Sequence, residues 1–150
     1  MARQRQGTHG SSDALVDELF DTTVMLRSFA ESRLRPMGAS VARLRALRML
    51  AREGEPLRMR DLSEMLGIAA RTTTTIIDSL EQDGLVERVR HLDDRRAFLL
   101  TLTETGRARY QEAEAIDTQA LAEATGALSA EEREQLRALL GKVRDAVEQA

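Results

Sequence analysis

One short stretch, residues 71–77 with the sequence RTTTTII, combines side chains that can recognise a charged polymer. A guanidinium can bind phosphate, or the N7 and O6 atoms of guanine, through paired hydrogen bonds. A threonine hydroxyl can reach a phosphate or a base edge, and its methyl group can contact the methyl group of thymine. Outside a binding context such a run is more simply explained as filler on a solvated surface. The candidate contact residues are Arg71, Thr72, Thr74 and Thr75, followed one turn later by Ser79.

A second candidate site is the sequence Asp93-Asp94-Arg95-Arg96. Aspartate favours turns, so Asp93 is assigned to a turn, whereas Asp94 is expected to pair with an arginine. Arg95 and Arg96 can enter a narrow A·T-rich minor groove, whose negative potential attracts arginine. Arg95 is equally compatible with a solvent-exposed position. The preceding His91 could contact a phosphate, but a surface position at the end of a strand is favoured.

The composition excludes several other chemistries. The chain has no cysteine, two histidines and no glycine-rich phosphate loop. Disulfides, thiolate metal sites and thiol oxidation are thereby excluded, and His9 and His91 do not make a zinc site. We therefore expect no catalytic residue, no metal and no cofactor, and we do not expect an enzyme.

The charge is distributed unevenly along the chain. The net charge is −3, yet residues 27–60 contain nine arginines against three glutamates, and residues 104–150 contain ten acids against six bases. Residues 1–12 are polar and are expected to form a disordered tail, without the apolar core of a signal peptide. No apolar run approaches the ~18 residues that a membrane span needs. A cytoplasmic protein without a membrane partner is expected.

The spacing of apolar residues places the two candidate sites on specific elements. Although threonine and isoleucine favour strands, Thr73, Ile76, Ile77 and Leu80 recur at helical intervals, which predicts a helix over residues 70–82. A preceding helix over residues 60–66 ends at Gly67, so the pair forms a helix-turn-helix. Residues 85–91 and 96–102 predict a β-hairpin with the acidic and basic sequence at its tip. The fold class is therefore mainly α with a small β-hairpin wing, a winged helix-turn-helix.

The remaining helices lie at the two ends of the chain. Helical spacing covers residues 13–35, then a helix after Ser40, one from Thr103 to about residue 125, and a last one after Ser129. A single domain over residues 13–150 is predicted, with a winged lobe at about 40–102 and outer helices at about 13–35 and 103–149. The outer helices carry apolar stripes that one small domain does not cover. This pattern indicates a homodimer built from the terminal helices.

From about residue 13 onwards, the chain resembles the MarR (multiple antibiotic resistance regulator) family of bacterial transcription regulators. The most specific part is Asp94-Arg95-Arg96 followed by Leu102-Thr103 and Gly106. The other residues that carry the resemblance are Leu62, Leu66, Gly67, Arg71, Leu80, Gly84, Leu85, Val86 and Arg88.

The resemblance implies a homodimeric regulator that binds a pseudo-palindromic operator in double-stranded DNA. By analogy with the family, this regulator is expected to be a repressor rather than an activator. The resemblance places residues 70–82 in a major groove and the wing in a minor groove, with Asp94 orienting Arg96. It also implies phosphate contacts from Ser40 and Arg43, and a small-molecule effector in a cleft lined by Met25, Phe29 and Met37. The alternative is a winged-helix module for protein–protein contacts without specific DNA binding.

Two residues depart from the family pattern. Thr73 stands where an aliphatic residue is usual, and its hydroxyl can bond back to the carbonyl four residues earlier. Ala69 stands where a capping side chain is usual, and a missing cap costs about 1 kcal/mol. These departures predict a helix over residues 70–82 that is loosely held until DNA orders it.

Overall fold

The structure, a computed structural model, describes residues 14–150. The predicted tail, residues 1–12, lies outside the described residues. The elements, in chain order, are α1 (Ala14–Leu34), the 3-10 helix η1 (Arg35–Met37), α2 (Val41–Glu53), β1 (Leu57–Arg58), α3 (Met59–Leu66), α4 (Ala70–Gln82), β2 (Val86–Arg90), β3 (Phe98–Leu102), α5 (Glu104–Ala124) and α6 (Ala130–Glu148).

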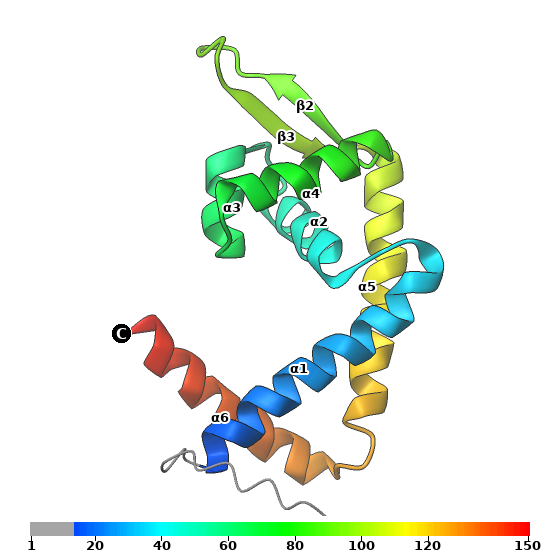
Figure 1. The fold of residues 1–150 in the computed structure, drawn as a ribbon, viewed down its shortest axis with the longest axis vertical. Coiled ribbons are helices and arrows are strands. Elements are labelled where there is room, and N and C mark those ends of the chain that lie inside the picture. Colours follow the sequence, from blue (N-terminus) through cyan, green and yellow to red (C-terminus); the bar gives the residue numbers. More distant parts are fainter. Residues whose placement is uncertain (1–13) are drawn as a thin grey trace, which may run out of the picture.

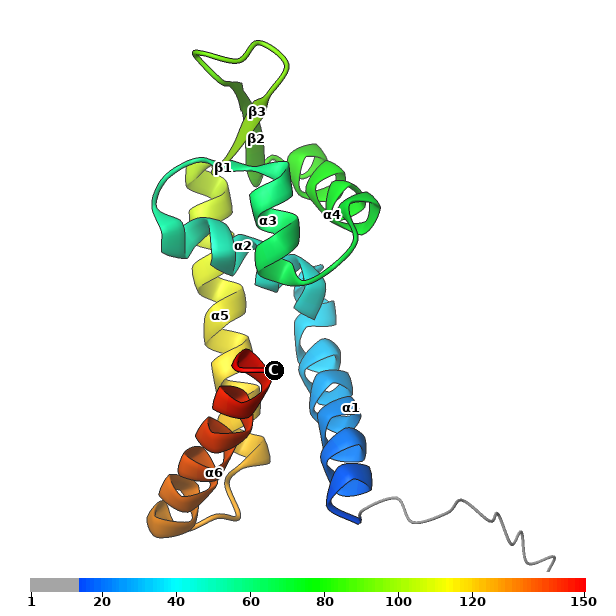
Figure 2. The same ribbon diagram turned by 90° about the vertical axis from the view of Figure 1, so that its left-hand side faces the viewer.

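The elements form a winged lobe, residues 41–102, and an outer layer made of α1, α5 and α6. The long helix α5 runs from the base of the wing away from the lobe, and α1 crosses it (Figure 1). Below the lobe, α1 and α6 diverge from each other, and α6 runs back towards the lobe (Figure 2). The mainly α fold with a β wing is confirmed. No helix within residues 14–150 is long and apolar enough to cross a bilayer.

The core of the winged lobe is aliphatic and lies between α2, α3, α4 and the sheet. Leu62, Ile77, Leu80 and Leu100 are at most 1% exposed, and α2 contributes Leu47 and neighbouring apolar residues to the same cluster. Burying a leucine or isoleucine side chain contributes about 1.5–3 kcal/mol. This cluster therefore fixes α4 against α3 and leaves the opposite face of α4 free for other contacts.

The helix starts differ in how their backbone N–H groups are satisfied. Ser40 caps α2 by accepting a hydrogen bond from the Arg43 backbone N–H at 3.2 Å. Ser129 and Glu132 form the predicted capping box of α6. Ala69, at the start of α4, makes no side-chain cap, as predicted. The recognition-type helix α4 therefore begins with N–H groups that no capping side chain satisfies.

The sheet has three antiparallel strands in the order β1-β3-β2, one more than the predicted hairpin. In the hairpin, Val86 pairs with Leu102 and Arg90 with Phe98. The additional strand β1 pairs Leu57 with Leu100 and Arg58 with Leu99. The expectation of a two-stranded wing was thus incomplete, because two residues are too few to show a strand pattern and β1 exists only through its pairing with β3.

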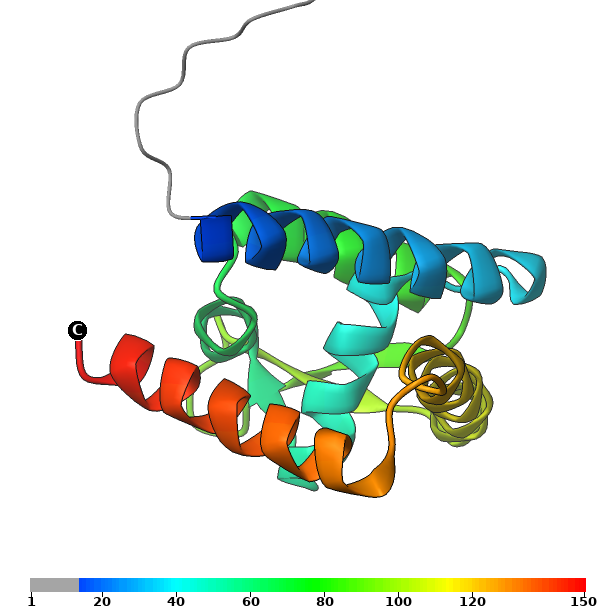
Figure 3. The same ribbon diagram turned by 90° about the horizontal axis from the view of Figure 1, so that it is seen from below.

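Helix α6 packs very little against its own chain. None of its residues is buried, and its stripe of Leu136, Leu139, Leu140, Val143 and Val147 is exposed. The first half of α1 is similar, with Leu15, Phe20 and Met25 about 70% exposed. Seen from below, α1 and α6 lie on two different sides of the molecule (Figure 3). An amphipathic helix gains most of its stability by burying its apolar face, which a single chain does not do here.

Candidate nucleic-acid interface

Helix α4 divides the threonine run as predicted from its period. Thr73 is fully buried with Ile77 and Leu80. The side chains predicted to face outward are Arg71, Thr72, Thr74 and Thr75, which are exposed, and Ser79, which is half-buried. One face of α4 is therefore core, and the other presents a cation, hydroxyls and methyl groups to solvent.

The threonine hydroxyls are less available than their exposure indicates. Thr73 donates to the Ala69 carbonyl at 3.3 Å, Thr74 to Ala70 at 2.9 Å, and Thr75 to Arg71 at 3.1 Å. The back-bond predicted for Thr73 is confirmed, and two more occur that were not anticipated. Each of these three hydroxyls donates its only hydrogen to a backbone carbonyl. It can therefore act only as a hydrogen-bond acceptor towards a bound molecule, next to its methyl group.

The tip of the wing is held by two side chains that accept backbone N–H bonds. Asp94 Oδ1 accepts from the Arg96 N–H at 3.0 Å, and His91 Nδ1 accepts from the Asp93 and Asp94 N–H groups at 3.1 and 3.2 Å. Within residues 14–150 Asp94 makes no ion pair with an arginine, so the expected Asp94–arginine pair is wrong. Asp94 instead forms an Asx-type turn, the role predicted for Asp93. Its carboxylate orients the backbone of Arg96 and leaves the guanidinium exposed.

The base of the wing is tied to α4 by Arg88. Its guanidinium pairs with Asp78, and its Nε lies 3.3 Å from Glu81 Oε2. Since β2 and α4 are also packed against each other, these ion pairs hold the wing at a set angle to α4. Arg88 was recognised as a motif residue, but its role as a link required knowledge of the fold.

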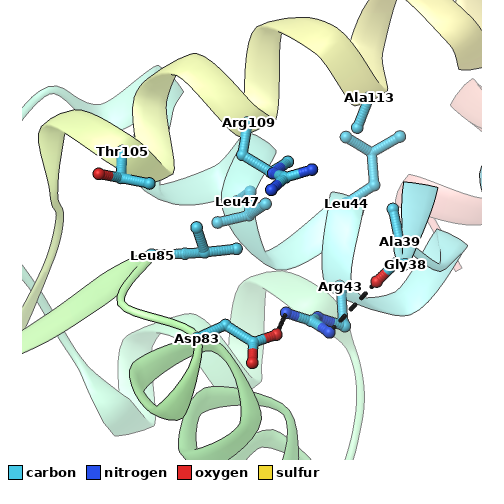
Figure 4. A pocket seen from close by; sticks show the side chains of 10 residues that line it. All are labelled: Gly38, Ala39, Arg43, Leu44, Leu47, Asp83, Leu85, Thr105, Arg109 and Ala113. Carbon is cyan, nitrogen blue, oxygen red and sulfur yellow. Dashed lines mark hydrogen bonds and ion pairs between the residues drawn. The ribbon is translucent and has the colours of Figure 1, made fainter.

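Arg43, a predicted phosphate contact, is occupied within the protein. Its guanidinium pairs with Asp83 at the end of α4 and lies 3.4 Å from the Gly38 carbonyl (Figure 4). Ser40 is likewise occupied as the cap of α2. The Arg43 guanidinium would therefore have to share its charge between Asp83 and a phosphate. The sequence could not reveal a pair that joins residues 40 positions apart.

A cavity of about 270 Å³ lies between α2, the end of α4 and α5. Leu44, Leu47 and Ala113 form its apolar side, while Arg43 and Arg109 bring two guanidinium groups (Figure 4). The residues predicted to line an effector cleft, Met25, Phe29 and Met37, are not among those that line this cavity. Met25 is 71% exposed on α1, and Met37 packs against the cluster of Leu34, Leu44 and Ala113.

The lobe and α5 are joined by a partly buried ion-pair network. Arg48 on α2 donates to Glu114 Oε2 at 2.8 and 3.0 Å and to Asp117 Oδ2 at 3.1 Å. Burial opposes the charge on Arg48, but the hydrogen bonds and charges of Glu114 and Asp117 outweigh it and raise the pKa of the guanidinium. The network therefore stays charged at any pH at which the carboxylates are ionised.

The Leu-Thr-x-x-Gly motif at the start of α5 has a steric explanation. Thr103 accepts from the Gly106 N–H at 2.9 Å and donates to the Gly84 carbonyl at 2.6 Å. Its own N–H binds the Leu85 carbonyl at 3.1 Å. A Cβ atom on Gly106 would lie 1.8 Å from that Leu85 oxygen. Glycine is therefore required at this position, because the backbone after α4 presses directly on α5.

Fold and site together define a winged helix-turn-helix module. Within the described residues, no cluster of three or more histidine or acidic side chains could hold a metal ion. The MarR family model matches residues 40–98. An HTH-type transcriptional regulator of Bacillus subtilis (strain 168), YwhA, is 31% identical over 97 residues, which are 65% of this chain and 69% of the relative. The chain belongs to the MarR family.

Solved structures agree with this assignment. A MarR-family transcriptional regulator from Rhodococcus sp. RHA1 has a TM-score of 0.76 at 25% identity, over 88% of this chain and 96% of that chain. Wild-type MarR from E. coli has a TM-score of 0.79 at 24% identity, over 89% and 98% of the two chains. A MarR variant from E. coli complexed with operator DNA has a TM-score of 0.76 at 24% identity, over 87% and 94%. As a member of the MarR family, the protein is a DNA-binding transcription regulator and not an enzyme.

Proposed function

We propose that the protein is a repressor that binds a pseudo-palindromic operator as a homodimer. One observation carries the proposal: the exposed face of α4, with Arg71 and Thr72 near its start, lies on the same lobe as a wing whose tip carries Arg95 and Arg96. The N-terminal residues of such a helix read base edges in the major groove, and wing arginines suit the adjacent minor groove. Thr74, Thr75 and Ser79 complete the surface, and Asp94 shapes the turn that carries Arg96.

The exposed apolar faces of α1 and α6 support a second copy of this chain as the partner. Five apolar side chains of α6 and the apolar residues in the first half of α1 are left uncovered in one chain. A two-fold symmetric contact buries the same patch on both subunits and covers these stripes at once. We therefore assign residues 13–35 and 103–149 to the dimer layer and residues 40–102 to the DNA-binding lobe.

The cavity between α2 and α5 supports control by a small molecule. Arg43 and Arg109 would bind an anionic group of an effector, and Leu44 and Leu47 would contact its apolar part. Arg43 also holds Asp83 at the end of α4. An effector that competes for Arg43 would change the support of α4 and lower the affinity for the operator. Such a regulator acts on the chromosome, which places it in the cytoplasm.

The test is binding of the full chain to duplex DNA selected from a random library, measured by fluorescence anisotropy at several salt concentrations. We expect enrichment of an inverted repeat with half-sites about 10 bp apart, and a steep loss of affinity with salt. Size-exclusion chromatography with light scattering should give a dimer, and Leu139→Glu should give a monomer. Undetectable binding to any duplex at low salt would overturn the proposal in favour of a protein-interaction module.

A further inference from the structure

His91 at the wing tip has one ring nitrogen whose state is set by its neighbours. Nδ1 lies 3.1 Å from the Asp93 N–H and 3.2 Å from the Asp94 N–H. Both neighbours are donors, so Nδ1 must accept, and it carries no proton in this conformation. A neutral imidazole keeps its single proton on the other nitrogen. His91 therefore presents an Nε2–H donor on the side of the ring away from the turn.

The Nε2–H donor of His91 faces another donor. Nη2 of Arg58 lies 3.5 Å from Nε2, and a guanidinium has no acceptor atom. Among residues 14–150, neither nitrogen has an oxygen acceptor. Two N–H donors that converge without an acceptor can bind a ligand that places an electron-rich oxygen atom between them.

The surroundings of this donor pair are basic. Arg58, on the edge strand β1, also lines a cleft of about 330 Å³ together with Arg60, Arg88 and Arg96. Asp78 and Glu81 compensate the charge of Arg88, and the Asp94 carboxylate is bound to the backbone of Arg96. The Arg58 guanidinium has no carboxylate partner among the described residues. The site thus favours an anion over a neutral oxygen.

We propose that His91 Nε2–H and Arg58 Nη2–H together bind one non-bridging oxygen of a DNA backbone phosphate beside the wing. This rests on the proposed function, in which the wing enters a minor groove. Phosphates line both edges of that groove. A phosphate oxygen accepts several hydrogen bonds, so it satisfies both donors at once. Free inorganic phosphate offers the same chemistry, and the experiment separates the two sources.

Variants at His91, Arg58 and Lys142 separate the contact from the turn. His91→Asn keeps an oxygen acceptor near the position of Nδ1, in an Asx-type turn, but removes the Nε2–H donor. Arg58→Gln removes the cation. Lys142→Gln is the matched control, because it removes one positive charge from an exposed side chain of α6 that is not part of the apolar stripe. The Asp93 and Asp94 amide signals should stay in place in His91→Asn and move in His91→Ala, which shows that the turn survives in the first variant.

Affinity is measured for the operator and for a scrambled duplex, over a range of salt concentrations. Arg58→Gln should weaken binding to both duplexes by the same factor, roughly tenfold or more. Since a dimer would lose two phosphate contacts, the slope of log K against log salt should become shallower by about 1.8. His91→Asn should weaken both duplexes equally and add little to Arg58→Gln, because the two side chains share one oxygen. Lys142→Gln should leave the slope unchanged.

The proposal is overturned if wild-type protein binds the operator but Arg58→Gln keeps the wild-type affinity and slope. It is also overturned if the loss is confined to the operator, since a phosphate contact carries no sequence information. In a second arm, inorganic phosphate is added to the DNA-free protein at constant ionic strength while the His91 ring signals are followed. Saturable shifts with unchanged DNA binding by the variants would assign the site to free phosphate. Failure of the wild type to bind DNA would instead remove the proposed function.

Discussion

Replacing Gly106 by alanine tests whether the junction between the winged lobe and α5 is as tight as the structure shows. The added Cβ would meet three backbone atoms of Leu85, the oxygen at 1.8 Å, the carbonyl carbon at 2.7 Å and Cα at 3.1 Å. Backbone atoms cannot rotate away as a side chain can. The start of α5 must therefore move away from Leu85 by more than about 1 Å to reach ordinary contact.

The magnitude follows from two opposing effects. Overpacking of this kind costs about 1–3 kcal/mol, and the backbone clash places Gly106→Ala near the upper end. Alanine is about 1 kcal/mol better than glycine inside a helix, which offsets part of that cost. A net loss of about 2 kcal/mol is expected, corresponding to a Tm lower by about 4–8 °C for a chain of this size. Both are measured at fixed protein concentration, because the stability of a dimer depends on it.

The control is Gly141→Ala on α6, where an added Cβ meets nothing within 4 Å. It should leave stability unchanged or raise it by up to about 1 kcal/mol. Gly106→Ala should also weaken operator binding at temperatures where it is fully folded, because in the proposed homodimer α5 connects the lobe to the dimer layer and sets the spacing of the two α4 helices. A variant as stable as the wild type, with unchanged operator affinity, would refute the tight junction.

Three further predictions address the cap of α4, the wing and the α2–α5 link. Ala69→Ser should raise the free energy of unfolding by about 1 kcal/mol in urea titrations, because the backbone at Ala69 already has the extended cap conformation and lacks only a side-chain acceptor. Amide exchange in α4 that is equally slow with and without DNA would contradict the prediction of a loosely held helix. Arg96→Ala should weaken operator binding while size-exclusion chromatography still gives a dimer, and unchanged affinity would remove the wing from the interface. Arg48→Met should lower stability by about 1–2 kcal/mol, between the values for exposed and buried ion pairs, and no loss would show that the network is not stabilising.

The bounds of α4 were predictable although its residues favour strands. Buried positions 73, 77 and 80 repeat with a helical period, and that pattern depends only on which residues are apolar. The two caps at Ser40 and Thr103 were predictable for the same local reason, since a capping side chain bonds to an N–H three residues away. Local periodicity and capping thus determined most of the element order.

The parts that could not be predicted all depend on contacts between distant segments. Strand β1 is two residues long and exists because β3 provides its partner. Arg43 was assigned to a phosphate contact by resemblance to the family, but its guanidinium pairs with Asp83 in the folded chain. The position of the cavity likewise depends on how α5 packs on α2, and its lining differs from the residues predicted for an effector cleft. Side-chain roles were therefore less predictable than helix bounds.

The threonines of α4 show how such contacts change a chemical role. Because the Thr74 hydroxyl donates to Ala70, its remaining contribution to a base edge is a lone pair and a methyl group. Thr72 has no such back-bond among the described residues, so its hydroxyl can still donate to DNA. Thr74→Val should therefore keep most of the operator affinity, whereas Thr72→Val should change it, with a shift in base preference of about 1–3 kcal/mol at one position of each half-site. Competition binding against operators substituted at single positions measures both effects. Equal losses for the two valine variants would mean that DNA breaks the Thr74 back-bond and that both hydroxyls act as donors.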